Sequence, residues 1–246
     1  MTKFYASYTP ERKETLEDHI IYGMAFIKWK YLDKNYHKYL SARLKSFYIE
    51  IDPYLSADIV MAAYFLHDSG KAFIPLQNNI KMGHGAPGHE VLSAILSLKS
   101  IKIVANIPEE VKRNLKNSIA CAIILHMSAL RSPIEGINVL LRNKSYIFSK
   151  NAARFFRNLV KKSSWKWRGI SFDFKEFQVN TDDIRQLINN IAPIFAVYKR
   201  NNRRFIPYFL LTNLLVHPVI MADEFSASLD SNKSTRPWAR EFINSI

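Results

Sequence analysis

The segment AAYFLHDSGK (residues 62–71) decides the fold and indicates the chemistry of this chain. Its apolar first half continues a helix, which Gly70 stops directly after His67 and Asp68. Burying an imidazole and a carboxylate there costs free energy unless both groups meet partners. Neighbouring side chains on a helix point about 100° apart, so the two residues need not bind one metal ion in the same way. The imidazole can bind one ion while the carboxylate bridges to a second.

Lys71 follows Asp68 by three residues and has two interpretations. Its ammonium group could neutralise negative charge that develops on a phosphate. It could equally complement the dipole at the end of the preceding helix.

Apolar segments of helical length make up most of the remaining sequence. One period-two stretch, Gly169–Val179, alternates apolar and polar residues and predicts one strand of a small hairpin. The sequence therefore predicts an all-α bundle with a minor β-hairpin element. The predicted helices are Thr9–Tyr31, a helix capped by Ser56 that stops at Gly70, Pro87–Leu98, Pro108–Ala129, a short helix from Ser132, Thr181–Arg200 and Arg203–Ser228.

The composition is that of one folded domain, with 246 residues of which 48% are hydrophobic. We expect residues 1–246 to form this single domain. The one cysteine, Cys121, cannot form an intrachain disulfide, and the N-terminus does not resemble a signal peptide, so we expect a cytoplasmic protein. The most apolar stretch, Phe205–Ala222, contains Thr212 and His217 and predicts a buried core helix, with no membrane partner.

Positive charge is concentrated in one region of the chain. The net charge is +14, and residues 141–204 hold 15 Lys/Arg against 4 Asp/Glu, interleaved with aromatic residues. Such a region attracts phosphate backbones and can stack on unpaired bases, although a solvated basic face or an acidic membrane surface would also suit it. The side chains predicted to contact nucleic acid are Lys161, Lys162, Trp165, Lys166, Trp167 and Arg168.

A set of possible metal ligands is spread over separate apolar helices. A single histidine in such a helix is usually a hydrogen-bonded core residue, but several can converge inside a bundle. The mixed nitrogen and oxygen ligands suit Mn, Fe, Co or Ni, with Mg as an alternative, and predict one or two divalent ions. The ligand candidates are His19, His67, Asp68, His89, His126 and Asp223.

The order of these motifs resembles a known family. His19, the H-D-x-G-K segment and a distant Asp223 are similar to the HD phosphohydrolase superfamily. The segments GHEVLSA (residues 88–94) and ADEFSAS (residues 222–228) look like the HD nuclease domain of type I CRISPR-Cas systems. The resemblance extends from His19 to Ser226 and implies an HD-domain helical bundle.

The resemblance implies a role for each ligand. His19, His67, Asp68 and Asp223 would hold the first ion, and Asp68 would bridge to a second. His89 and His126 would hold that second ion. The residues with an implied catalytic role are Asp68, Lys71 and Ser226, of which Lys71 and Ser226 would contact the scissile phosphate.

The sequence departs from the family at the second ion. The family often has two adjacent histidines at the position of His126, but Met127 follows here. Water or His84 could replace the missing ligand, and His84 could equally belong to a loop that faces the substrate.

The implied activity is hydrolysis of single-stranded DNA, with RNA as an alternative. The chain has no phosphate-binding G-x-x-x-x-G-K-[ST] motif, so a separate CRISPR helicase chain would unwind the DNA, next to an RNA-guided surveillance complex. Two other functions stay open: hydrolysis of a small phosphate ester, and non-catalytic binding of nucleic acid.

Overall fold

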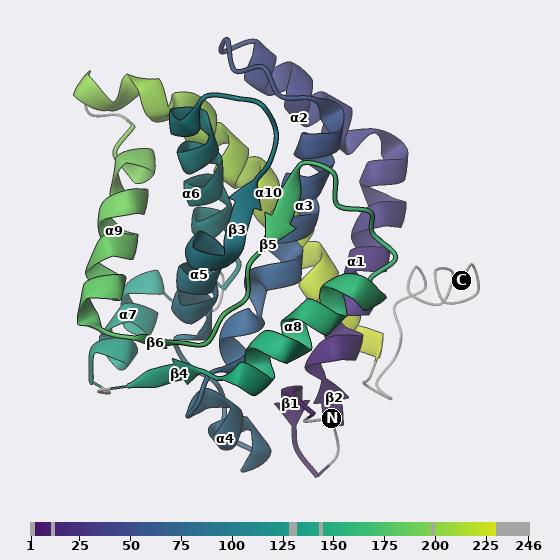
Figure 1. The fold of residues 1–246 in the computed structure, drawn as a ribbon, viewed down its shortest axis with the longest axis vertical. Helices are drawn as coiled ribbons and strands as arrows, with labels where there is room; N and C mark the ends of the chain where they lie inside the picture. Colours follow the sequence, from purple (N-terminus) through teal and green to yellow (C-terminus); the bar gives the residue numbers. More distant parts are fainter. Residues whose placement is uncertain (1–2, 11–12, 128–131, 143–144, 198–199, 230–246) are drawn as a thin grey trace.

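A computed structural model describes residues 3–10, 13–127, 132–142, 145–197 and 200–229 (Figure 1). Residues 128–129 of one predicted helix lie outside the described residues. So do residues 143–144 and 198–199 of the basic region.

The described part of the chain is predominantly helical, which confirms the predicted fold class. Its α-helices are α1 (Leu16–Lys30), α2 (Tyr36–Lys45), α3 (Pro53–His67), α4 (Leu76–Lys81), α5 (His89–Ser100), α6 (Glu109–Leu125), α7 (Pro133–Arg142), α8 (Lys150–Lys162), α9 (Thr181–Phe195) and α10 (Ile206–Leu229). Its strands are β1 (Tyr5–Tyr8), β2 (Lys13–Thr15), β3 (Ile101–Ile103), β4 (Tyr146–Phe148), β5 (Ile170–Phe172) and β6 (Phe177–Val179).

Helix α3 lies at the centre of the bundle and packs against α1, α2, α5, α6 and α10 (Figure 1). It begins one turn before the predicted cap Ser56, because the Asp52 side chain accepts a hydrogen bond from Leu55 N and Pro53 starts the helix. Nearly every residue of α3 is buried, so it has no polar face. Its last residue is His67, and Asp68 therefore emerges inside the bundle.

The predicted helix start at Thr9 is wrong. The chain first forms the antiparallel hairpin β1–β2, and α1 begins only at Leu16. The effective cap is Thr15, whose hydroxyl accepts a hydrogen bond from Asp18 N. The hairpin packs over α1 and α4, at one end of the bundle.

The prediction of one hairpin strand in Gly169–Val179 is wrong in its pairing, although minor β structure is present there. This stretch forms two strands, and each pairs antiparallel with a distant segment: β5 with β3, and β6 with β4. The alternating pattern marked these strands, but it could not give non-local partners.

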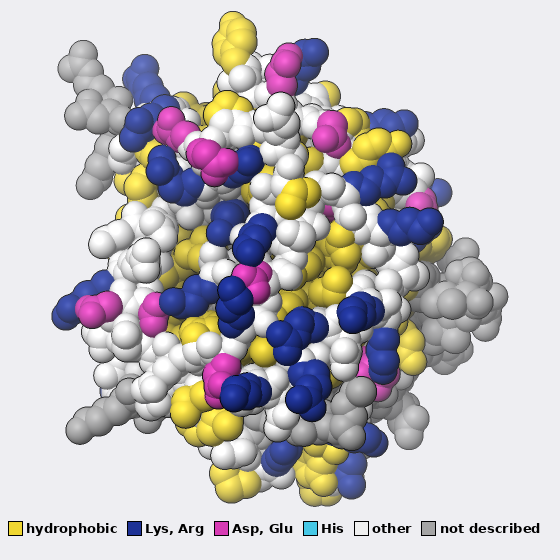
Figure 2. Space-filling view, viewed as in Figure 1, with side chains coloured by type: hydrophobic (Ala, Val, Ile, Leu, Met, Phe, Trp, Pro, Cys, Tyr) yellow, Lys and Arg dark blue, Asp and Glu magenta, His cyan; other side chains and the backbone are white. Residues whose placement is uncertain are grey.

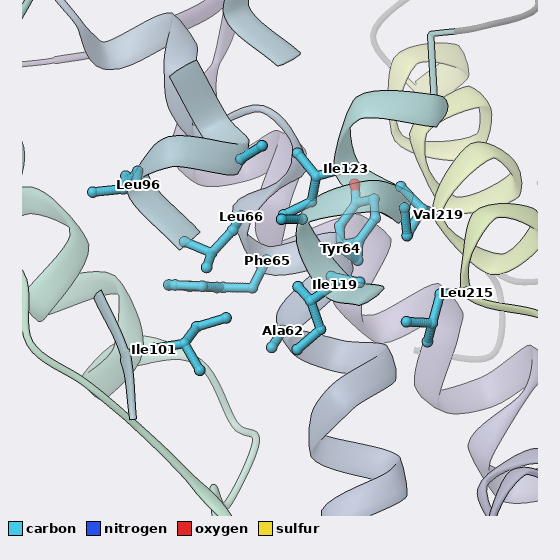
Figure 3. Close-up of a cluster of buried hydrophobic side chains, with 14 of the residues drawn as sticks. Ala62, Tyr64, Phe65, Leu66, Leu96, Ile101, Ile119, Ile123, Leu215 and Val219 are labelled. Atoms are coloured by element: carbon cyan, nitrogen blue, oxygen red, sulfur yellow. The ribbon is translucent and has the colours of Figure 1, made fainter. Parts of the chain in front are cut away.

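The core lies where α3, α5, α6 and α10 meet (Figure 3). Helix α10 is long and apolar enough to cross a membrane by length and composition alone, but half of its most apolar window is buried in the protein. Its contacts with α1, α3 and α6 are those of a core helix. Side chains in this core include Ala62, Phe65, Leu66, Leu96, Ile119, Ile123, Leu215 and Val219.

Candidate metal centre

Asp68 lies at the turn that joins α3 to the 3-10 segment Ser69–Ala72. This turn is pressed against α5. A Cβ atom on Gly70 would lie 2.0 Å from the His89 carbonyl oxygen, so only glycine fits there. Gly70 N also donates to the Ser93 hydroxyl at 2.7 Å. These contacts fix Asp68 beside the first residue of α5.

The first group of possible metal ligands is His19, His67, Asp68 and Asp223, whose ligand atoms all lie within 4.8 Å of one another. His19 Nε2 is 3.3 Å from both His67 Nε2 and Asp68 Oδ2, and 3.2 Å from Asp223 Oδ1. The three ligands other than Asp223 are nearly inaccessible to solvent. The Asp223 side chain is 28% exposed, so the group is open to solvent on the side of α10.

The second group is Asp68, His89 and His126, which also lie within 4.8 Å of one another. His89 Nε2 lies 2.9 Å from Asp68 Oδ1, and His126 Nε2 lies 3.9 Å from the same oxygen. Asp68 thus presents Oδ2 to the first group and Oδ1 to the second. This is the arrangement of a carboxylate that bridges two ions.

Three histidines share one orientation. The rings of His67, His89 and His126 each direct Nδ1 at the backbone carbonyl three residues earlier. A carbonyl only accepts, so each Nδ1 carries a proton, and in the neutral ring this leaves a lone pair on Nε2. His126 Nε2 is buried and has no hydrogen-bond partner among the described residues. A metal ion would satisfy this lone pair.

Glu14, which the sequence reasoning missed, holds the fourth histidine. It is buried in β2 and its carboxylate accepts from His19 Nδ1 at 2.7 Å. A carboxylate behind a metal-binding histidine fixes the ring and increases its basicity. The only signal in the sequence is an acidic residue five positions before His19, which is too common to be specific.

The two aspartates stay charged in this setting. Burial alone would raise the pKa of Asp68, but Lys71, His67 and His89 hold it well below its usual value. Burial alone would also raise the pKa of Asp223. Hydrogen bonds from His19 and His67 outweigh this effect and hold the pKa of Asp223 well below its usual value. Lys71, with Nζ 2.5 Å from Asp68 Oδ2, has a raised pKa because Asp68 and Asp223 overcome its burial.

The imidazoles respond in opposite directions. Burial opposes the charged form of His19, but Asp223, Glu14 and Asp68 raise its pKa to about 9. Burial and the neighbouring His67 lower the pKa of His126 to about 3. The first group therefore favours positive charge, and the second holds a neutral imidazole, which is the form that binds metal.

These residues fit divalent metal ions. The chain supplies anionic oxygens, neutral imidazole nitrogens, fixed ring orientations and one bridging carboxylate. Nitrogen and carboxylate ligands together are typical of Mn, Fe, Co and Ni sites.

Ser226 lies behind the first group. It is 1% exposed, and its hydroxyl lies 2.9 Å from the Tyr64 hydroxyl and from the Ala222 carbonyl. Tyr64 in turn donates to the His19 carbonyl at 2.9 Å. These contacts connect Ser226 to His19 through Tyr64, and a direct contact with the phosphate stays a prediction.

A cavity of about 440 Å³ adjoins the candidate metal centre, because the candidate ligand His89 lines it. Lys71 and His89 line it, together with β1, Met127 and the loop that contains His84. His84 belongs to neither ligand group, so its position favours the substrate-facing role over the ligand role. Met127 stands at the cavity wall, next to the second group.

The two tryptophans of the predicted nucleic-acid surface are partly buried. Trp165 Nε1 donates to Asp58 at 2.8 Å. The Trp167 ring packs edge-on to Phe172 and Phe65, with centroids 4.8 and 5.8 Å apart. These contacts attach the segment after α8 to α3, so both rings have a structural role. Stacking of bases on them stays a prediction.

The charged members of that surface are exposed. Lys161 and Lys166 reach solvent, and Arg168 stacks on an exposed tyrosine ring. Lys162 Nζ is 2.6 Å from Glu17 Oε1, two residues before His19. The end of α8 is therefore beside the start of α1, and the basic surface reaches the end of the bundle that contains the metal centre.

The chain is similar to known proteins over most of its length. No family model matches the chain. The CRISPR-associated endonuclease Cas3-HD of Saccharolobus solfataricus is 24% identical over 238 residues, which cover 91% of this chain and 90% of that relative. The solved CRISPR-associated Cas3 HD domain protein of Methanocaldococcus jannaschii is 19% identical with a TM-score of 0.54, covering 84% of this chain and 95% of that one. The comparisons confirm the resemblance seen in the motifs, and they support an HD-domain CRISPR-associated protein.

Proposed function

We propose that this chain is a metal-dependent phosphodiesterase that cleaves single-stranded DNA as the HD nuclease of a CRISPR system. The observation that carries the proposal is the Asp68 carboxylate, which presents one oxygen to each of two groups of ligand atoms. His19, His67 and Asp223 would complete the first site, and His89 and His126 the second. When bound, two such ions clamp a phosphodiester and activate water.

The residues of the chain would orient the substrate. Lys71 is 18% exposed, lines the 440 Å³ cavity and stays protonated beside Asp68. Its ammonium would therefore face a phosphate that enters from the cavity and stabilise the charge that develops there. Ser226 and Tyr64 would keep His19 in position.

The charge on helix α8 favours an extended nucleic-acid strand as the substrate. All charged residues of this helix are Lys or Arg. Its exposed side carries Lys150, Arg154, Arg157 and Lys161. Figure 2 shows Lys and Arg side chains gathered over this face. Phe155 on the buried side of α8 packs against Phe4, next to β1, which lines the cavity. Lys161, Lys162, Lys166 and Arg168 would guide the strand from α8 to the metal centre.

The proposed setting is cytoplasmic. Unwinding would be done by a separate helicase chain, with an RNA-guided complex that exposes the single strand. The basic surface would bind the single-stranded DNA. Single-stranded RNA is the alternative substrate.

A small phosphate ester is the rival substrate, because a 440 Å³ cavity is within the usual range for small ligands. The test is a panel of end-labelled single-stranded DNA, single-stranded RNA and deoxynucleotides, each with Mn, Co, Ni or Mg and with EDTA. We expect metal-dependent cleavage of the labelled DNA. Hydrolysis of deoxynucleotides alone would support the small-ester enzyme. A folded protein that binds no metal and cleaves nothing would instead be a nucleic-acid-binding subunit.

A further inference from the structure

A second cavity, of about 520 Å³, lies away from the metal centre. It is lined by the second half of α5, by β3, by the first half of α6 and by α9, whereas His89 starts α5 and His126 follows α6. Ten residues of helix separate Lys116 from His126, which corresponds to about 15 Å at 1.5 Å per residue. Figure 2 shows this face, where Lys and Arg side chains, with some Asp and Glu among them, border apolar side chains.

Helix α6 brings three cations to this cavity: Lys112, Arg113 and Lys116. Lys116 is four residues from Lys112 and three from Arg113, spacings at which like charges repel on a helix. Two carboxylates also line the cavity, but each already pairs with a lysine: Glu109 with Lys112 at 2.8 Å, and Asp183 with Lys99 at 2.7 Å. Arg113 and Lys116 have no ion pair within the part of the chain that the structure describes. Burial lowers the pKa of Lys116, so its ammonium loses water without gaining a carboxylate. A bound anion would offset both the repulsion between these cations and the lost hydration of Lys116.

The other walls suit a base more than a simple ion. Ile95, Leu98 and Leu187 offer apolar surface, and Asn117 and Gln186 offer amide groups that both donate and accept hydrogen bonds. The volume is within the range of small-ligand sites. An inorganic anion would use the cations alone.

We propose that this cavity binds a nucleotide unit, with its phosphate held by Lys116 and Arg113 and its base against the apolar wall. The unit would be either a free mononucleotide or one residue of a nucleic-acid strand. This site shares no residue with the metal centre, so it stands or falls independently of the proposed nuclease activity.

The test is calorimetric titration of the full chain carrying Asp68→Ala, with EDTA present, so that hydrolysis and metal-bound ligands do not contribute. The titrants are deoxyadenosine monophosphate, inorganic phosphate and a 12-residue oligodeoxynucleotide. Lys116→Gln and the exposed Arg113→Gln are compared with Lys45→Gln, which removes the same charge from a side chain 74% exposed on α2. Since Arg113 is exposed, its substitution leaves the fold intact.

We expect the nucleotide affinity to fall about tenfold or more in Lys116→Gln and in Arg113→Gln, because a hydrogen bond to a charged group is lost. Lys45→Gln should bind as the parent does. If the affinity for the oligonucleotide falls equally in these two variants, the bound unit is part of a strand. If the affinity for the oligonucleotide does not fall, the bound unit is a free nucleotide. The proposal is overturned if the parent does not bind the nucleotide, if phosphate binds as tightly, or if the three variants bind equally.

Discussion

At the scale of single residues, Glu14 contacts a candidate metal ligand without belonging to the ligand set. Its carboxylate accepts from His19 Nδ1 and contributes to the raised pKa of that imidazole. We expect Glu14→Gln to weaken metal binding roughly tenfold, in the range seen when such supporting carboxylates are lost. Competitive metal titration with a chromogenic chelator would measure the change.

The matched control for this substitution is Glu17→Gln. Glu17 lies nearby at the start of α1 but binds Lys162, not a candidate ligand. Equal metal affinity in wild type and Glu14→Gln would show that Glu14 does not support His19.

A second ion would depend on His126, whose Nε2 has no hydrogen-bond partner among the described residues. We expect wild type to hold two ions per chain at saturation and His126→Ala to hold one, by elemental analysis after dialysis. The first group should be unaffected, since His126 does not belong to it. One ion in both proteins would mean that Met127 leaves the second site incomplete.

The ligand candidates could be predicted from the sequence because burying them is costly unless they converge. The structure brings all six together in two groups that share Asp68. Glu14 and Tyr64 could not be predicted, since a single acid or tyrosine in an apolar context has many ordinary uses. Ser226 was assigned to the phosphate by resemblance, whereas its hydrogen bonds join it to Tyr64.

At the scale of elements, Asp58 fastens the segment after α8 to α3. This buried carboxylate accepts from Trp165 Nε1 at 2.8 Å and from the backbone N–H groups of residues 168–170 at 2.6–3.2 Å. We expect Asp58→Ala to lower the free energy of unfolding by about 3 kcal/mol, because several donors lose their partner inside the protein. Urea denaturation would measure this loss.

Asp58→Asn keeps one accepting oxygen and should cost less than Asp58→Ala. If Asp58→Ala were as stable as wild type, the carboxylate would not hold this segment.

The exposed cations of helix α8 lead to a prediction for DNA binding when their charge is reversed. The double reversal Arg154→Glu/Lys161→Glu should weaken binding of single-stranded DNA and flatten its dependence on salt, because each lost phosphate contact reduces the slope of log K against log salt by about 0.7. Fluorescence anisotropy across a salt series would measure both quantities. The reversal Lys38→Glu/Arg43→Glu on α2 changes the net charge equally and is the control. Equal effects of the two pairs would exclude α8 as the track.

Helices were easier to predict than their ends or the strands. The pattern of apolar residues located α3, α5, α6, α9 and α10, because their faces are buried in one core. It missed the hairpin β1–β2, in which strand pairing overrides the Thr9–Pro10 start signal. It also missed α8, in which the basic residues on the exposed side are as numerous as the buried apolar residues that mark a helix.

At the scale of the whole molecule, the candidate metal centre brings together distant parts of the chain. Its candidate ligands lie on α1, α5 and α10 and at the ends of α3 and α6, so ions would bind only the folded protein. A metal concentration about 100 times Kd would stabilise the fold by about 2.7 kcal/mol. We expect the Tm to rise by roughly 5–10 °C with Mn, and Asp68→Ala to remove the rise. The same increase in both proteins would place the bound metal elsewhere.

The central claim is that Asp68 organises a metal centre that cleaves phosphodiester bonds. It is tested most directly by incubating end-labelled single-stranded DNA with wild type, Asp68→Ala and the surface control Asp33→Ala, with each divalent metal and with EDTA. We predict cleavage by wild type and Asp33→Ala that requires metal, and a loss of at least a hundredfold in Asp68→Ala, about 2.7 kcal/mol of transition-state stabilisation. Cleavage that persists in Asp68→Ala, or that EDTA does not stop, would contradict the account.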